Sequence, residues 1–145
     1  DLIICNKQSY PEILYLGYRF DPVFTAVSID GKKVKQISLF RALFDSMNLR
    51  RVYQPSDCTE NLQDILRRAD KSHSGPVVLF PEGVNSNGKG LLEMTDAMKN
   101  VSIDKLRTHV IGFKYYWHYF SPNYTVGSVF VHLYHLCGQV KNTLI

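Results

Sequence analysis

The sequence has no apolar run that approaches the length of about 18 residues needed to cross a bilayer, so the printed residues predict no membrane span. Its three cysteines, Cys5, Cys58 and Cys137, are odd in number and include no closely spaced pair. That pattern argues against a disulfide framework and indicates reduced thiols in a cytosol-facing compartment. No Met precedes Asp1 and an apolar run begins at once, which we interpret as a piece of a longer protein.

Internal repeats, low-complexity tracts and linkers are also missing, so the chain predicts a single domain, residues 1–145. Acidic residues are in deficit, with 13 Asp and Glu against 17 Lys and Arg, and the sequence pI is near 9.0. A net charge of +4 suits an anionic partner, and nucleic acid, anionic lipid and phosphorylated metabolites all qualify. The basic residues are dispersed rather than gathered into a stripe, so we expect no nucleic-acid partner.

Apolar periodicity predicts strands that alternate with helices. Leu2 to Cys5 and Pro22 to Ser28 are typical of short strands, and Pro76 to Phe80 is typical of a strand buried on both faces of a largely parallel sheet. Val110 to Phe113 and Val126 to Val131 are two further strand candidates. The order of these elements predicts an α/β fold, with a mostly parallel central sheet flanked by helices.

Two helices are predicted from apolar residues at helical spacing. The buried face of the first comprises Ile37, Phe40, Phe44 and Met47. The buried face of the second comprises Leu62, Ile65, Leu66 and Ala69. The segment Asp57-Cys58-Thr59-Glu60 has an acidic residue followed by Glu three positions later, which predicts the cap that starts the second helix.

Two polar clusters follow apolar strands, one at residues 6–12 and the other at residues 80–90. Glu82 and Gly83 come at the carboxyl end of a central strand, where open α/β sheets bind ligands. The glycines of the second cluster permit backbone shapes that aim amide N–H groups at a phosphate. The alternative is a tight surface turn with a solvated Glu82.

The second cluster also resembles a nucleotide-binding P-loop, because Gly83 is followed after four residues by Gly88-Lys89. The match fails at Gly90, which stands where a Ser or Thr hydroxyl should bind Mg²⁺. Glu82 would also place a negative charge beside the phosphates. We therefore do not assign nucleotide binding.

In the first cluster, Ser9-Tyr10-Pro11-Glu12 fits a capping box at the start of a helix. This assignment places Lys7 in the preceding loop, from which its side chain can fold back toward Glu12. Glu12 can therefore be interpreted in two ways. In the structural interpretation its carboxylate caps the helix, and in the functional interpretation its carboxylate contacts the side chain of Lys7.

Together the clusters resemble the first and third blocks of the glycerophospholipid acyltransferase (PlsC-type) family. The family's first block is Asn-His-X-Ser with an acidic residue five positions after the His, and its third is Phe-Pro-Glu-Gly-Thr-Arg-Ser. Here they read Asn6-Lys7-Gln8-Ser9 with Glu12, and Phe80-Pro81-Glu82-Gly83-Val84-Asn85-Ser86. The resemblance extends over nearly the whole chain, and residues 120–128 are most similar to fungal lysophosphatidate acyltransferases.

The resemblance implies a glycerol-phosphate acyltransferase-like fold that transfers a fatty acyl group from acyl-CoA to lysophosphatidate, giving phosphatidate, without metal or other cofactor. It implies acyl-CoA, a lysophospholipid and a membrane surface as partners, at the cytosolic face of the endoplasmic reticulum or a lipid droplet, within a longer membrane-associated protein. By position, Lys7 replaces the catalytic His and Glu12 matches the acidic residue that orients it. The implied substrate-binding residues are Phe80, Pro81, Glu82, Gly83, Asn85, Ser86, Arg50 and Arg51.

Two positions that carry a positive charge in the family carry none here. Asn85 replaces the Arg of the third block, and the closing Arg of the second block corresponds to Pro55. Arg50 and Arg51 are the candidates to supply the missing charge, and the alternative is that both are hydrated surface side chains.

Lys7 is the departure with the largest chemical effect. The reference pKa of lysine is about 10.4, so a free amine at pH 7 costs about 4.6 kcal/mol, whereas histidine titrates near pH 6.5. That cost offsets most of the roughly 10² to 10⁴-fold that general base catalysis contributes. We expect weak or silent catalysis, through divergence or because position 7 is altered. The alternative is a non-catalytic lysophospholipid-binding or scaffold protein with the same fold.

Two other groups of residues attract attention without defining a site. His132 and His135 lie three residues apart, but no third metal ligand is identifiable, so we predict an aromatic-like packing role and assign no metal. The aromatic run at residues 115–120 suits either a membrane interface or the core beneath a loop, and both alternatives stay open.

Overall fold

The computed structural model describes residues 1–48, 52–86, 88–90, 92–99, 101–102, 106–117, 120–124, 127–139 and 143–144. The strands of the main sheet are β1 (Leu2–Cys5), β2 (Val23–Val27), β3 (Val34–Ile37), β4 (Val77–Leu79) and β5 (Thr108–Ile111). The helical segments are α1 (Pro11–Phe20), α2 (Leu39–Met47), α3 (Leu62–Lys71), the 3-10 turn η1 (Asp96–Met98) and α4 (Val129–Cys137). A separate two-stranded ribbon is formed by β6 (Tyr115–Tyr116) and β7 (Thr143–Leu144).

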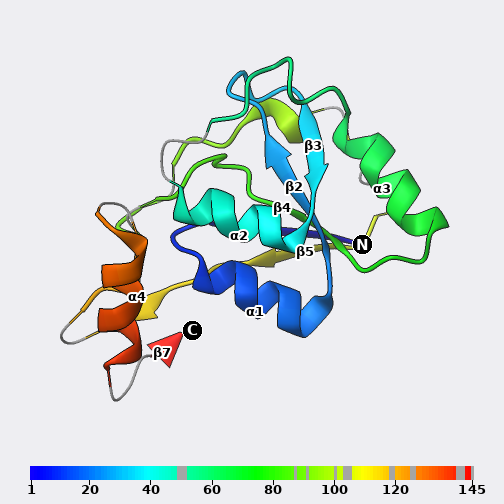
Figure 1. The fold of residues 1–145 in the computed structure, drawn as a ribbon. Coiled ribbons are helices and arrows are strands. Elements are labelled where there is room, and N and C mark those ends of the chain that lie inside the picture. The colour runs from blue at the N-terminus through cyan, green and yellow to red at the C-terminus, as the bar shows by residue number, and fades with distance from the viewer. Residues whose placement is uncertain are drawn as a thin grey trace.

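The main sheet has the strand order β3-β2-β4-β1-β5 (Figure 1). β1 pairs in parallel with β4 on one side and with β5 on the other, and β2 pairs in parallel with β4. Only β3, which lies at one edge beside β2, runs antiparallel among the strands of this sheet in the described part of the chain. The chain is thus an α/β domain with a mostly parallel central sheet, as the sequence predicts.

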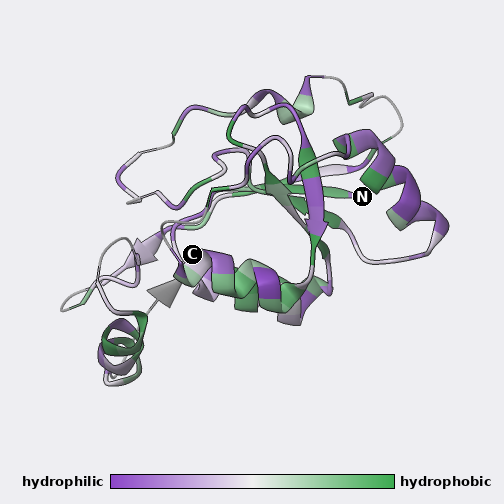
Figure 2. Cartoon of the chain, turned by 45° about the horizontal axis from the view of Figure 1, so that its top comes forward, coloured by the Kyte–Doolittle hydropathy of each residue, from purple (hydrophilic) through white to green (hydrophobic). Residues whose placement is uncertain are grey.

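Helices cover the two faces of this sheet. One core contains Ile3 and Val78 of the strands together with Ile13 of α1 and Ala42 of α2. The other contains strand residues of opposite parity together with Leu62, Ile65, Leu66 and Ala69 of α3. Because successive strand side chains point to opposite faces, α1 and α2 lie on one face and α3 lies on the other. Figure 2 shows hydrophobic strands at the centre of the molecule and a largely hydrophilic outer side of α3.

The strands predicted from continuous apolar runs are confirmed. β1 matches the predicted segment, and β2 and β4 lie inside their predicted ranges. β1 and β4 are buried along their whole length, as expected for inner strands of a parallel sheet. β5 overlaps the candidate at Val110 to Phe113 but begins and ends two residues earlier.

The second predicted helix is confirmed with its buried face, but its predicted cap is wrong. Asn61 is the residue that precedes α3, and it makes no side-chain capping hydrogen bond. Glu60 instead exchanges backbone hydrogen bonds with Val34, and its carboxylate forms an ion pair with Arg68 at 2.8 Å. Pairing with the edge strand therefore takes Glu60 away from the helix end.

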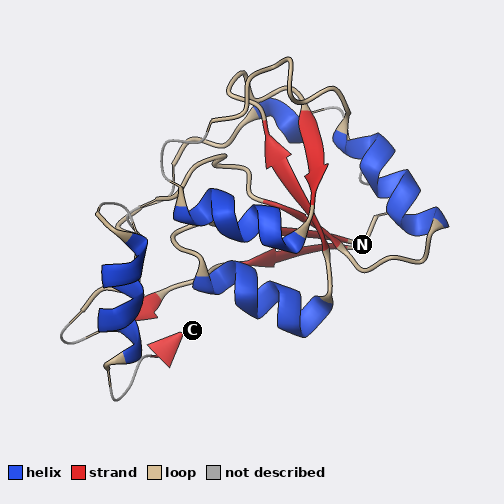
Figure 3. Cartoon of the chain, viewed as in Figure 1, coloured by secondary structure: helices blue, strands red, loops and turns tan. Residues whose placement is uncertain are grey.

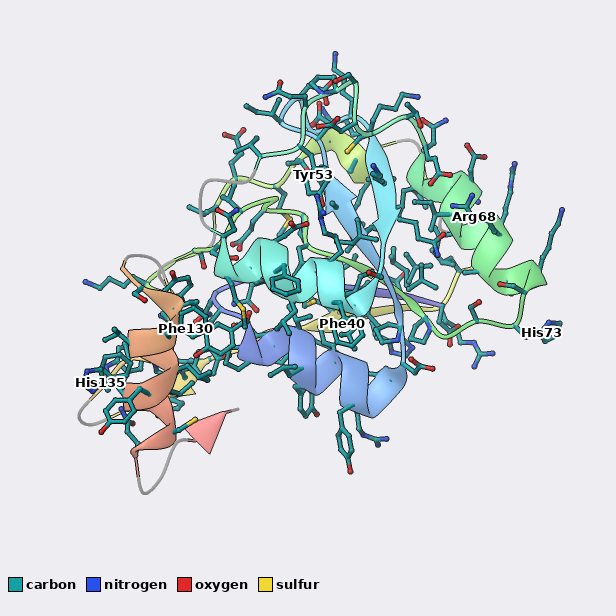
Figure 4. All side chains as sticks on the ribbon, viewed as in Figure 1. Phe40, Tyr53, Arg68, His73, Phe130 and His135 are labelled. Carbon is teal, nitrogen blue, oxygen red and sulfur yellow. The ribbon has the colours of Figure 1, made fainter. Side chains whose placement is uncertain are left out.

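The first predicted helix exists as α2, but its predicted buried face is wrong. Phe40, labelled in Figure 4, is 71% exposed, and Phe44 is 66% exposed. Ala42 and Ser46 are buried instead. The segment before Ser38 forms strand β3, so Ile37 lies in the sheet and the helix starts only after it. Small side chains face the sheet because α2 also packs beside α1 and leaves little space between them.

The strand predicted at Val126 to Val131 is also wrong. Residues 129–137 form the helix α4, which starts after Ser128, whose carbonyl accepts a hydrogen bond from the His132 amide at 3.0 Å. Val126 itself lies outside the described residues. No described helix is long and apolar enough to span a bilayer.

Candidate functional site

The two polar clusters meet at one edge of the sheet. β1 and β4 are parallel neighbours, with Ile4 opposite Leu79, so both chains leave the sheet at the same edge (Figure 3). The Lys7 amide donates to Glu82 Oε2 at 3.3 Å, and the Ser86 amide donates to the Lys7 carbonyl at 2.7 Å. Two loops that lie 75 residues apart in the sequence therefore form one structure.

The first loop is held by the chain that follows β5. Asn6 and Phe113 exchange two hydrogen bonds, from Asn6 Nδ2 to the Phe113 carbonyl at 3.0 Å and from the Phe113 amide to Asn6 Oδ1 at 2.7 Å. Gln8 Nε2 donates to the same carbonyl at 2.8 Å. These contacts fix the backbone on both sides of Lys7 and direct it toward the second loop.

Glu12 lies fully buried in the first turn of α1. Its Oε2 accepts hydrogen bonds from the amides of Gln8 at 3.0 Å and Ser9 at 2.9 Å. This is half of the predicted capping box. The other half is wrong, because the residue before the helix is Tyr10 and the buried Ser9 hydroxyl has no partner in the described chain. Glu12 Oε1 is likewise buried without a hydrogen-bond partner among the described residues.

The ionisation of Glu12 is shifted by its surroundings. Burial raises the pKa of Glu12 to about 7, while hydrogen bonds from the Ser9 and Gln8 amides and the positive charge of Lys7 act in the opposite direction. Burial and the negative charge of Glu12 raise the pKa of Tyr115, which keeps that hydroxyl protonated. The sequence showed Tyr115 only as part of an aromatic run and gave no sign that it lies beside Glu12.

The stability of the folded chain should therefore fall as Glu12 ionises. Its folded pKa of about 7 lies above its ordinary value of 4.5, so between these pH values the folded state binds more protons than the unfolded state. The free energy of unfolding then decreases with rising pH across this window, by about 3 kcal/mol. In urea denaturation at about pH 5 and about pH 8, Glu12→Gln should remove this decrease, whereas the exposed control Glu93→Gln should retain it. The same decrease in both variants would contradict the assignment.

Glu82 ties the second loop to the first. It is only 6% exposed, and each of its carboxylate oxygens accepts a backbone hydrogen bond: Oε2 from Lys7, and Oε1 from Leu92 at 2.9 Å. The alternative of a solvated Glu82 on a surface turn is therefore wrong. Gly83 follows with a φ of +70°, a conformation that glycine adopts at little cost.

The other predicted substrate-binding residues of the second loop are mostly buried or hydrogen-bonded to the surrounding protein. Phe80, Pro81 and Ser86 are buried, and the Pro81 carbonyl accepts a hydrogen bond from the Thr95 amide at 2.9 Å. Asn85 Nδ2 donates to the Ser46 carbonyl at 3.0 Å, which holds this loop against α2.

A cavity of about 190 Å³ opens between the second loop and the wall made by β2 and α2. Lys7, Phe80 and Asn85 line one side of it. The apolar side chains of Ile13 and Ala42 contribute to its lining, so the cavity combines an apolar surface with a few polar groups.

The opposite wall carries a polar cluster that the sequence interpretation missed. Asp45 accepts a hydrogen bond from the Tyr53 hydroxyl and forms an ion pair with Arg41 at 3.2 Å (Figure 4 labels Tyr53). Both Asp45 and Tyr53 line the cavity. Burial and the hydrogen bond to Asp45 raise the pKa of Tyr53 to about 12. The spacing of Arg41 and Asp45 on one helix was the available signal, but it does not reveal Tyr53.

Lys7 projects its side chain into this cavity and is partly buried. Its Nζ lies 5.6 Å from the centroid of the Phe80 ring. Burial lowers the pKa of Lys7, and the carboxylates of Asp45 and Glu12 act against this shift. Arg50 and Arg51, the predicted phosphate-binding residues, lie outside the described residues.

The glycine-rich part of the second loop does not form a P-loop. After β4 no helix begins in the described chain before η1, whereas a P-loop opens directly into a helix. Gly88 instead approaches the first loop so closely that an added Cβ would lie 2.6 Å from Gln8 Oε1 and 2.6 Å from Asn123 Nδ2. This glycine is therefore needed for close packing of the two loops.

His132 packs α4 against the first loop. One ring nitrogen, Nδ1, lies 3.0 Å from the Tyr10 hydroxyl, and Nε2 lies 3.1 Å from the Ser121 carbonyl oxygen. The ring also contacts Phe120 and Tyr124, which agrees with the predicted packing role. Within the described residues, no group of three or more His, Cys, Asp or Glu side chains is arranged to hold a metal ion.

The aromatic run divides between the core and the surface. Tyr115 is buried, whereas Tyr116 is 52% exposed and Trp117 is 45% exposed. Tyr115 therefore belongs to the core, and a membrane interface for the exposed Tyr116 and Trp117 stays a prediction.

Comparison with known proteins gives no family for this chain: no family model, no curated protein and no solved structure matches it.

Proposed function

We propose that this domain has a glycerophospholipid acyltransferase (PlsC-type) fold, and that the cavity beside Lys7 receives the reacting ends of two substrates, the thioester of acyl-CoA and the glycerol hydroxyl of lysophosphatidate. The single observation that supports this most directly is the joining of the two motif-bearing loops through Lys7 and Glu82. In this proposal acyl transfer to lysophosphatidate gives phosphatidate at a low or undetectable rate, because Lys7 occupies the position of the general base.

The surroundings of position 7 support the assignment of Glu12 as the orienting carboxylate. Glu12 Oε1 is buried and makes no hydrogen bond of normal geometry among the described residues, although the Tyr115 hydroxyl lies close enough to interact with this carboxylate. A histidine at position 7 would bring an N–H donor to this part of the site, and a carboxylate that accepts such a bond stabilises the imidazolium formed during proton transfer. The same carboxylate favours the ammonium form of a lysine, so it assists one residue type and hinders the other.

A second candidate is lysophospholipid binding without turnover. Asn85, at the position of the family's phosphate-binding Arg, donates its hydrogen bond to the Ser46 carbonyl, which favours a structural role for this position. The exposed aromatic side chains of Tyr18, Phe40 and Phe44 support a membrane surface as partner for either candidate. The proposal also places the protein at the cytosolic face of the endoplasmic reticulum or a lipid droplet. This location rests on the resemblance to the family.

The proposal is tested by measuring lysophosphatidate binding by calorimetry and CoA release from acyl-CoA in the same preparation. We expect lysophosphatidate to bind, and Val84→Trp, at the cavity rim, to weaken binding by roughly tenfold or more through steric blockage. The matched control is Val110→Trp on the exposed part of β5, away from the cavity lining, which should bind normally.

CoA release that depends on lysophosphatidate would identify an enzyme, and binding without release would identify the non-catalytic candidate. Equal binding by both tryptophan variants would overturn the assignment of the cavity as the lipid site.

A further inference from the structure

Lys7 stands apart from the other cations of the described chain because its amine lies in the cavity wall. It is the only basic residue among those that line this cavity in the described part of the chain. No carboxylate of that part forms an ion pair with its Nζ, which lies 5.6 Å from the centroid of the Phe80 ring. Lys99 is a contrasting case, because its amine is on the surface and forms an ion pair with Asp96 at 2.8 Å.

These surroundings raise the neutral fraction of the Lys7 amine above that of an exposed lysine. Removing an ammonium ion from water is unfavourable, and burial accordingly lowers the pKa of Lys7, although Asp45 and Glu12 act against this. A neutral lysine amine has a free electron pair and is a nucleophile toward carbonyl carbon, which is how desolvated lysines serve in covalent chemistry. The Lys7 amine is thus a better nucleophile than the amine of a lysine in water.

We propose that Lys7 is a self-acylation site, whose Nζ accepts an acyl group from a short-chain acyl thioester bound in the cavity. The Nζ electron pair attacks the thioester carbonyl carbon, the new N–C bond forms, and the C–S bond breaks with its electron pair leaving on sulfur. The proton lost from nitrogen ends on the released thiol. An amide is stable, so the modification accumulates to one acyl group per chain and fills the cavity.

The size and lining of the cavity set the class of acyl group. A volume of about 190 Å³ suits a short acyl chain, and the apolar side chains of Ile13, Ala42 and Phe80 supply the surface against which its carbons pack. The choice of a thioester as donor rests on the proposed function, whereas the reactivity of the amine does not.

The experiment uses the whole chain and two acyl donors. The protein is incubated at about pH 8 with acetyl-CoA in one arm and with a trace of N-acetoxysuccinimide in the other, and the acetylation of each lysine is followed by peptide mass spectrometry. We expect Lys7 to be acetylated by acetyl-CoA faster than the exposed Lys71 and Lys99 by roughly tenfold or more, because the cavity holds the donor beside the amine. In urea-unfolded protein this preference should vanish.

Lys7→Arg serves as the charge-retaining variant, and the internal comparison among lysines keeps the test valid if that variant does not fold. Preferential acetylation of Lys7 by acetyl-CoA supports the inference even if lysophosphatidate is neither bound nor acylated. Preferential labelling by N-acetoxysuccinimide alone overturns it, because the amine is then reactive but takes no thioester. Equal labelling of all lysines in both arms overturns it as well.

Discussion

Lys7→His should increase the lysophosphatidate-dependent release of CoA from acyl-CoA by roughly 10² to 10⁴-fold, the range that a positioned general base contributes. Histidine titrates near pH 6.5, so its basic form is abundant at neutral pH. Burial lowers the pKa of Lys7 and two carboxylates oppose that shift, but lysine starts from a reference pKa of about 10.4. Thiol release measured at saturating acyl-CoA is the appropriate assay.

Two controls make this result specific to position 7. Lys71→His places the same substitution on an exposed lysine at the end of α3 and should leave the rate unchanged. Adding Glu12→Gln to Lys7→His should remove most of the gain, since the imidazole then loses the carboxylate that stabilises its charged form. If Lys7→His gives no gain while the variant remains folded, position 7 does not hold the base.

Glu82→Ala should destabilise the fold by roughly 2–4 kcal/mol, because the partly buried amides of Lys7 and Leu92 would each lose a carboxylate acceptor. The two loops would then separate, and lysophosphatidate should bind more weakly as a result. Urea unfolding followed by circular dichroism measures the first effect, and calorimetry measures the second.

Two further variants test whether this effect comes from the hydrogen bonds that Glu82 makes between the loops or from the loss of a negative charge. Glu93→Ala removes an exposed carboxylate from the same loop and should change stability by less than about 0.5 kcal/mol. Glu82→Gln retains one oxygen acceptor and should lie between the other two variants. A loss smaller than about 1 kcal/mol for Glu82→Ala would mean that the bridge between the loops is not a main source of stability.

The sequence predicts the inner part of the fold well because local patterns decide it. β1 and β4 are buried on both faces and are therefore continuous apolar runs, and α3 has one buried stripe that matches its helical period. The start of α4, within the predicted strand at Val126 to Val131, is typical of a strand because its first residues are β-branched and aromatic. Whether such a short run becomes helix or strand depends on whether a neighbouring strand edge is free, which is not a local property.

The exposed aromatic side chains of α2 show a second limit. Phe40 and Phe44 fit the spacing of a helical face as well as Ala42 and Ser46 do. Because the phenylalanines are more hydrophobic, the sequence pattern predicts that their face is the buried one, but it is exposed. The structure selects the small residues because α2 must approach both the sheet and α1 closely. Hydrophobic pattern alone therefore identifies the helix but not the face that it buries.

The meeting of the two loops was predictable, whereas the far wall of the cavity was not. Parallel strands end at a common edge, so polar clusters after two such strands are expected to lie close together, and the hydrogen bond from Lys7 to Glu82 agrees with that expectation. Asp45 and Tyr53 reach the same cavity only through the packing of α2 on the sheet and the return of the chain near β2. Their proximity depends on long-range contacts that carry no sequence pattern.

The proposed function requires one pocket, formed by the loops after β1 and β4, that takes a single-tailed phospholipid. An NMR titration of the ¹⁵N-labelled chain with lysophosphatidate below its micelle concentration tests this most directly. We expect saturable shifts centred on the amides of Lys7, Gly83, Val84 and Asn85. Shifts confined to the exposed side of α4, or no saturable shift at these four amides, would contradict it.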